Sequence, residues 1–185
     1  MISAEEHEAA KAQAAELLRR AGVLVTADEE RDMDTADFGL GRLRVEGAQI
    51  VKWFDTPRVS ARVIALFPGQ TEPEHWHTST SEHAGKEETL RVVFGQLVLY
   101  VPGESRVRHG VVPEGKEEYY TARREHVMSP GDQFTVPPGT KHWFQAGDDG
   151  AVVLTLSTRA TDDQDLFSDP NIVRLTRVGS WSGRA

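Results

Sequence analysis

The sequence contains no cysteine, which excludes disulfide bonds and thiolate metal ligands. No apolar run approaches the roughly 20 residues of a membrane-spanning helix, and the opening MISAEEHEAAK is charged where a secretory signal would be apolar. Basic residues are few, 21 against 29 acidic ones, for a net charge of −8. We therefore expect a cytoplasmic protein without nucleic-acid or membrane partners.

The first 42 residues have little strand character. Ser3 is a plausible cap, and alanine and leucine recur at helical spacing up to Gly22, which predicts a helix over residues 3–21. Such an amphipathic helix usually packs on the body of its domain or on a partner subunit. Residues 26–41 are rich in Asp and Glu, so we expect an irregular, solvated segment there.

From about residue 43 the hydrophobic period changes to two, as between Val59 and Phe67. Further β-rich runs are separated by Pro-Gly pairs and lie at 90–101, 118–128, 132–137 and 151–158. Many short strands with turns between them predict an all-β sandwich or barrel, and 185 residues suit one domain. The expected division is 1–42 helix and acidic connection, 43–178 barrel and 179–185 tail.

One stretch, from Gly69 to Gly95, concentrates metal-binding side chains. His75 and His77 are two residues apart, so in a strand both imidazoles point to one face and can hold one ion. After a run of small polar residues at 78–81, Glu88 can return to the same place as a third ligand. Only one of the adjacent residues Glu87 and Glu88 can face the interior, and the six-residue spacing to Gly95 selects Glu88.

A fourth candidate ligand, His142, follows a strand that ends in a Pro-Pro-Gly turn. Three imidazoles and one carboxylate, without sulfur, suit Mn, Fe, Co, Ni or Zn. The other histidines, His83, His109 and His126, have no matching spacing and are expected to be surface or structural residues.

The spacing G-x5-H-x-H-x10-E-x6-G, followed by G-x5-P-x-G-x2-H, resembles the two cupin motifs. Two features depart from the common pattern: the His-to-Glu spacing is long, and Ala146 replaces a frequent Asn. The long spacing, together with strings such as LFPGQT, GKEET and KHWFQAG, resembles the short bacterial D-lyxose isomerases over nearly the whole chain. This resemblance implies a single-domain cupin, a jelly-roll β-barrel with an N-terminal helix, and a homodimer.

The resemblance also implies a reaction. D-lyxose isomerases interconvert D-lyxose with D-xylulose, and D-mannose with D-fructose. A divalent metal, Mn(II) in the first instance, lowers the cost of a cis-enediol while a base moves a proton between C1 and C2. The GKEET string assigns Lys86 to the substrate oxygens. A free sugar is expected rather than a sugar phosphate, because no phosphate-cradling glycine loop accompanies the motifs.

For the catalytic base and the sugar contacts, the chain departs from the family pattern at one position. The family has a glutamate on the strand after the last histidine ligand, where this chain has Thr155, which cannot be a base. Glu74, Asp163 or Asp165 is then the alternative catalytic acid. By resemblance the acidic segment 162–169 closes over the barrel mouth, so Asp165 and Phe167 are expected to contact the sugar, and Phe144 to form an apolar wall.

Two other functions use the same residues. A metal-cupin dioxygenase would use the three histidines and Glu88 to hold iron and would consume O2. A sugar-binding cupin without catalysis would bind its ligand in a metal-dependent way without turnover, and Thr155 favours this alternative. The fold alone does not choose among these functions.

The four-ligand assignment predicts that Glu88→Gln and His142→Ala each remove bound metal and activity together, because each deletes one donor to the same ion. Metal analysis and an isomerase assay on the same preparations check this. A variant that keeps a full equivalent of metal contradicts the assignment.

Overall fold

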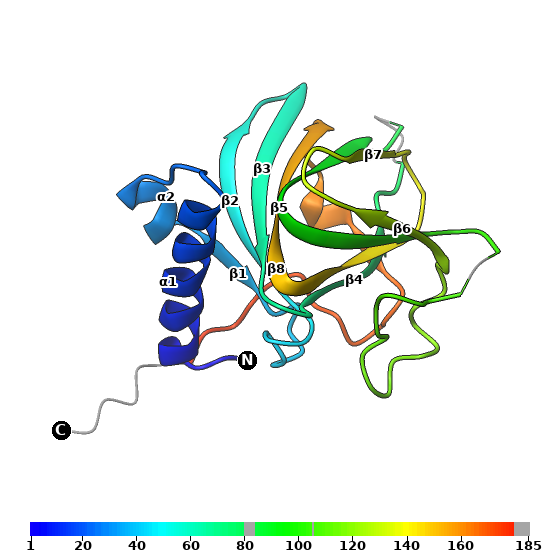
Figure 1. The fold of residues 1–185 in the computed structure, drawn as a ribbon, viewed down its shortest axis with the longest axis horizontal. Coiled ribbons are helices and arrows are strands. Elements are labelled where there is room, and N and C mark those ends of the chain that lie inside the picture. The colour runs from blue at the N-terminus through cyan, green and yellow to red at the C-terminus, as the bar shows by residue number, and fades with distance from the viewer. Residues whose placement is uncertain (80–83, 105, 180–185) are drawn as a thin grey trace.

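The computed structural model describes residues 1–79, 84–104 and 106–179 (Figure 1). The helices are α1 (Ala4–Arg20), α2 (Ala27–Arg31) and the 3-10 turn η1 (Asp162–Gln164). The strands are β1 (Asp34–Ala36), β2 (Ala48–Asp55), β3 (Val59–Leu66), β4 (Thr71–Trp76), β5 (Glu88–Val101), β6 (Arg124–Met128), β7 (Gln133–Val136), β8 (His142–Thr158) and β9 (Leu166–Phe167). Part of the predicted polar run (80–81), His83 and the tail after Gly179 lie outside the described residues.

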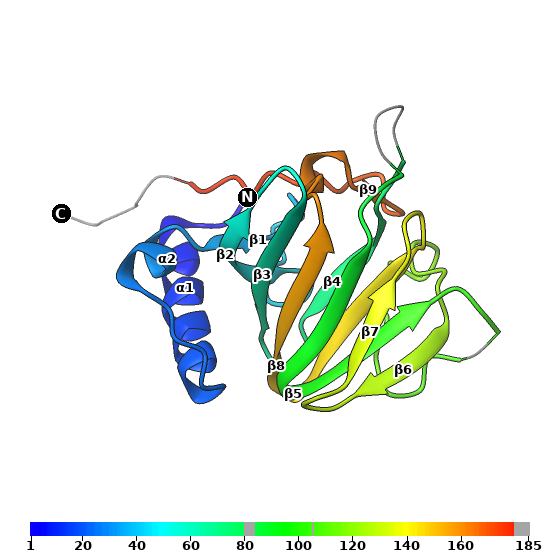
Figure 2. The same cartoon turned by 90° about the horizontal axis from the view of Figure 1, so that it is seen from above.

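All these strands belong to one sheet that curls on itself (Figure 2). One path runs β1-β2-β3-β8-β4-β9, and β5 leaves it to pair with β6, β7 and β8. The sheet can curl because β8 is 17 residues long and changes partners: one half pairs with β3, the other with β4, and β5 follows both halves. The predicted all-β barrel with an N-terminal helix is confirmed.

The helix α1 lies along the outer face of β2 and β3 (Figure 1). Ser3 caps it by accepting a hydrogen bond from the Glu6 backbone N–H at 3.0 Å. Its buried stripe of alanine and leucine packs against Val51, Val63 and Phe67. The helix therefore covers apolar strand residues that would otherwise face water, as the sequence predicted.

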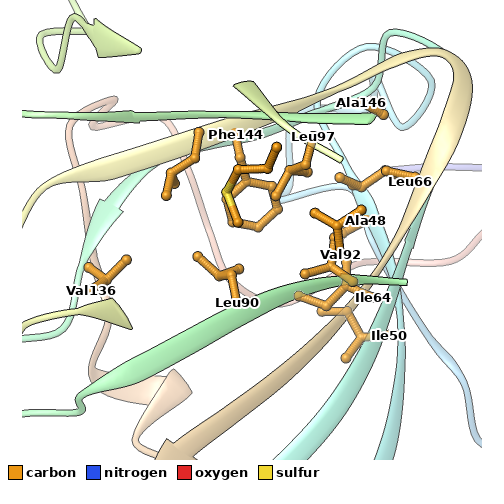
Figure 3. Packing of buried hydrophobic residues seen from close by; sticks show 14 of the residues in the cluster. Ala48, Ile50, Ile64, Leu66, Leu90, Val92, Leu97, Val136, Phe144 and Ala146 are labelled. Carbon is orange, nitrogen blue, oxygen red and sulfur yellow. The ribbon is translucent and has the colours of Figure 1, made fainter. Parts of the chain in front are cut away.

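A second apolar cluster fills the barrel (Figure 3). Ile64, Leu90 and Val92 come from β3 and β5, and Phe144 enters from β8. Because β3 contributes residues to both clusters, both of its faces are largely buried, which explains why the run 63–66 is apolar without interruption. The apolar cluster leaves one end of the barrel for polar side chains.

Two predicted segments differ from the structure. The acidic segment 26–41 is only partly irregular: Thr26 and Glu29 form a capping box that starts α2, and β1 pairs with β2. The expected solvation is confirmed for Asp28, Asp32 and Asp34, which are exposed, and acidic side chains near a helix N-terminus are also favourable. In the run 118–128 only β6 is a strand, because Tyr120 and Ala122 instead pack beside Trp143.

Among the described residues, no helix is both long and apolar enough to cross a membrane.

The tight crossing of β5 and β8 depends on Gly95. Its φ of 71° lies in the left-handed region, and a Cβ built there would overlap the carbonyl oxygen of Gly150. Gly69 has nearly the same φ, 69°, but no atom lies within 4 Å of its Cβ position. Comparing the same substitution at these two glycines therefore separates the cost of backbone strain from the cost of steric overlap.

Gly95→Ala should lower the free energy of unfolding by at least about 3 kcal/mol, because strain and overlap add, whereas Gly69→Ala should cost only about 1 kcal/mol. Urea unfolding of both variants beside the wild type measures the difference. Equal losses in the two variants would show that the β5–β8 crossing tolerates a side chain.

Candidate active site

The four predicted ligands meet at one end of the barrel. His75 lies on β4, His77 follows directly after it, and Glu88 and His142 begin β5 and β8. His75 and His142 face each other across the β4–β8 pair. One potential ligand atom from each of the four buried residues lies within 4.8 Å of the others. This spacing allows a single ion to contact all four.

Each imidazole is oriented by a hydrogen bond at Nδ1. Nδ1 of His75 lies 2.8 Å from the carbonyl oxygen of Pro73, and Nδ1 of His142 lies 2.9 Å from the carbonyl oxygen of Thr140. Nδ1 of His77 donates to Asp165 at 2.7 Å. Such contacts fix the ring and leave Nε2 free to bind metal. Nε2 of His142 is buried with no hydrogen-bond partner among the described residues, so the donor set fits a divalent cation.

The charges of the cluster are unequal. Burial, reinforced by the neighbouring histidines, lowers the pKa of His75 well below its usual range and that of His142 to about 4. Burial also opposes the charge on His77, but its hydrogen bonds to Asp165 and Glu88 outweigh burial and raise its pKa to about 9. The second proton on His77 must leave before Nε2 can bind an ion, which links metal affinity to pH.

Lys86 lies in the same site although β5 starts two residues later. Its Nζ is 3.0 Å from Asp162 Oδ1 and 3.6 Å from Glu88 Oε1, and the residue is only 5% exposed. Burial lowers the pKa of Lys86, but these carboxylates outweigh that effect and raise it above the usual value. The same ammonium group holds the pKa of Glu88 well below its usual range, against the effect of burial. Lys86 therefore offers a fixed positive charge.

A pocket opens beside the cluster and contains the predicted sugar-contacting residues. Phe144, Asp165 and Phe167 all line it. The segment after β8 reaches the site because β9 pairs with β4, which sets Phe167 opposite His75 with ring centroids 5.8 Å apart. The remaining lining residues are Phe38, Ile50, Arg62, Ile64, Glu72, His75, Lys86, Glu88, Asp162 and Arg174.

Two predicted catalytic acids lie elsewhere. Glu74 is buried outside the pocket lining, and its carboxylate accepts hydrogen bonds from the backbone N–H groups of Thr121 and Ala122 at 2.6 Å and from the Ser168 hydroxyl at 2.6 Å. It therefore anchors two loops. Asp163 is exposed and lines a neighbouring surface groove instead of this pocket.

A β-bulge places Glu72 in the pocket, where the sequence pattern favoured Glu74. The β4–β8 register shifts between Glu72 and His75, so these residues both line the pocket although they are three apart. Simple alternation would put them on opposite faces. Pro73 inside a strand was the available signal, because proline in a sheet is commonly found at bulges or edges.

Neighbouring residues of β8 face opposite sides. Phe144 lines the pocket as expected, whereas Trp143 does not; it stacks on Tyr100 with ring centroids 3.8 Å apart, on the other face of β8. Thr155 is paired in register with Arg62 and Leu90, and Leu90 belongs to the interior cluster. Thr155 thus faces the barrel interior, and Arg62 is a pocket residue that the sequence analysis did not identify.

Comparison with curated proteins finds relatives that align with most of the chain. This chain is 46% identical to the D-lyxose ketol-isomerase of Cohnella laeviribosi, over 90% of this chain and 92% of that protein. It is 42% identical to the D-lyxose/D-mannose isomerase of Thermosediminibacter oceani, over 88% and 91% of the two chains. A D-lyxose ketol-isomerase from Thermofilum sp. is 38% identical, over 96% and 99%.

Two further comparisons concern the fold. A family model described as the AraC-like ligand binding domain matches residues 110–174. The Cellulomonas parahominis L-ribose isomerase solved with L-ribose superposes with a TM-score of 0.81 at 20% identity, over 96% of this chain and 98% of that one. The L-ribose isomerase of Geodermatophilus obscurus gives 0.69 at 18% identity, over 95% and 90%.

Fold and site together define a cupin barrel with a candidate metal centre of three histidines and one glutamate. The predicted single-domain cupin is confirmed. Within this class, the identities of 38–46% decide the family: the chain belongs to the D-lyxose ketol-isomerases.

The Asp165–His77 contact predicts that Asp165→Ala weakens divalent-metal affinity about 10- to 100-fold, because His77 loses the acceptor that orients its ring. Isothermal titration of metal-free protein measures this affinity. Asp163→Ala, at an exposed position within η1, serves as the control and should bind metal like the wild type. Unchanged affinity in Asp165→Ala would contradict the orienting role.

Proposed function

We propose that the protein is a metal-dependent aldose–ketose isomerase that interconverts D-lyxose with D-xylulose, and D-mannose with D-fructose, through a cis-enediol. The observation that carries this proposal is the buried group of His75, His77, Glu88 and His142 with the ammonium of Lys86 beside it. The names of the relatives supply the sugars, since two are D-lyxose ketol-isomerases and a third is a D-lyxose/D-mannose isomerase.

A divalent cation held by the four ligands would polarise the sugar carbonyl and stabilise negative charge on its oxygen. Lys86 supports the same charge by donating a hydrogen bond to the developing oxyanion. Its position is fixed by Asp162, which also forms an ion pair with Arg62, with Nη2 and Oδ2 2.7 Å apart. Because the four ligands and Lys86 are already arranged, little reorganisation of these side chains is needed when charge develops.

The remaining lining groups suit an uncharged sugar. Asp165 offers a carboxylate to sugar hydroxyls, while Phe144 and Phe167 provide apolar surface. The two arginines of the lining are already paired, Arg62 with Asp162 and Arg174 with Asp34. A sugar phosphate would lack an unpaired arginine, so we propose a free pentose or hexose as substrate.

Three further attributes belong to the proposal. We propose Mn(II) as the metal, a homodimer as the assembly and the cytoplasm as the location. The dimer is supported by exposed apolar side chains on one outer face of the barrel, among them Phe54 at 46% and Leu156 at 48% exposure. Sedimentation analysis of the purified protein gives the assembly directly.

The function is tested by incubating the metal-loaded protein with D-lyxose and with D-mannose while ketose formation and dissolved O2 are both followed. We expect D-xylulose and D-fructose at constant O2, because isomerisation is redox-neutral. O2 consumption would favour the dioxygenase alternative, which the same ligand set permits. Tight sugar binding without ketose would favour a binding protein.

Lys86→Met should lower kcat/KM for ketose formation by about 100- to 1,000-fold, because the oxyanion loses one fixed donor. Metal content should stay near the wild-type value, since none of the four ligands changes. Lys52→Met is the control, because Lys52 is exposed on β2 and should leave both quantities unchanged. Wild-type turnover in Lys86→Met would remove Lys86 from the mechanism.

A further inference from the structure

The proposed isomerisation needs a group that removes a proton from one sugar carbon and returns it to the next. Four carboxylates line the pocket, and three of them already have partners. Glu88 accepts a hydrogen bond from His77 and lies beside Lys86, and Asp165 also accepts one from His77. Asp162 accepts a hydrogen bond from Lys86 and forms an ion pair with Arg62. Protonating any of these three would break an interaction that orders the site.

Glu72 is the fourth carboxylate, and it differs from the others. Its Oε2 is buried and has no hydrogen-bond partner among the described residues. A buried polar atom without a partner is costly, so such atoms are rare unless they have a role or receive a ligand. In this pocket the missing partner can be a substrate atom.

The backbone turns Glu72 towards the site. It pairs with Phe144 across β4–β8, and Phe144 belongs to the cluster inside the barrel. The bulge that follows Glu72 lets His75 line the same pocket. Glu72 is held on a strand rather than on a loop, which keeps its carboxyl group in a defined position next to the metal cluster.

The surroundings of Glu72 favour its protonated form more than those of an exposed carboxyl group. Burial, and after it the negative charge of Glu88, raises the pKa of Glu72 above its usual range, while Arg174 and Lys86 act in the opposite direction with smaller effect.

We propose that Glu72 is the catalytic acid–base that carries the proton between C2 and C1 of the sugar; this inference rests on the isomerase function proposed above. The Glu72 carboxylate takes the proton from C2 of the open-chain aldose, the C2–H electron pair forms the C1=C2 bond, and the carbonyl π pair moves to O1. The Glu72 carboxyl then returns the proton to C1, while O2 loses its proton and O1 gains one. No electrons are lost or gained overall.

The test compares metal-loaded wild type, Glu72→Gln, Glu72→Asp and the control Asp163→Asn, which makes the same carboxylate-to-amide change at an exposed position. Four quantities are measured: bound Mn(II), binding of D-fructose by calorimetry, ketose formation from D-lyxose and D-mannose, and uptake of deuterium from D2O at C1 of D-fructose by NMR. The last quantity reports the proton step itself.

We expect Glu72→Gln to keep its metal and to bind D-fructose within about threefold of wild type, while ketose formation and deuterium uptake fall at least about 100-fold. Glu72→Asp should recover part of both rates, and Asp163→Asn should match wild type. This combination separates a proton carrier from a residue that only maintains the fold, which would also move metal content or sugar affinity.

The possible failures are distinguishable. A wild type that binds metal but forms no ketose overturns the proposed function. An active wild type together with an active Glu72→Gln overturns the assignment of Glu72 alone. Loss of metal from Glu72→Gln also overturns the assignment, because Glu72 would then belong to the metal-holding structure and not to proton transfer.

Discussion

The placement of three imidazoles and one carboxylate inside an apolar barrel is the constraint on which the rest of the structure depends. Burying such groups is unfavourable unless each has a partner. The structure meets this requirement with backbone carbonyls behind His75 and His142, with Asp165 behind His77, and with Lys86 beside Glu88. The inward-facing atoms of the cluster are thereby left for an ion.

Local irregularities in the strands bring these groups together. The long β8 joins the barrel's two halves, and the Gly95–Gly150 approach lets β5 follow it closely. Because of the bulge in β4, the side chains of Glu72 and His75 line the same pocket. Glu74 lies outside this pocket, where it anchors the loop at Thr121 and Ala122. The β-bulge and the close approach of the two glycines thus determine which carboxylates line the pocket.

The sequence predicted the features that depend on short-range spacing. The His-x-His pair, the later Glu88 and His142, and α1 all follow from periodicity and turn residues close together in the chain. It did not predict Arg62 or Glu72, because their roles depend on register between distant strands. It also did not predict the short helix α2 within the acidic segment 26–41, where Thr26 and Glu29 form a capping box. Thr155 faces the barrel interior, at the position where the resemblance leads one to expect a glutamate, so the base must be another residue.

The central claim is that one buried four-ligand site is the isomerase centre. The most direct test is a titration of metal-free protein with Mn(II) in which bound metal and D-fructose formation from D-mannose are measured on the same samples. The account predicts that activity is absent at the start, rises in proportion to bound metal and stops rising at one ion per chain. Full activity without metal, or metal bound at one equivalent with no ketose formed, would contradict it.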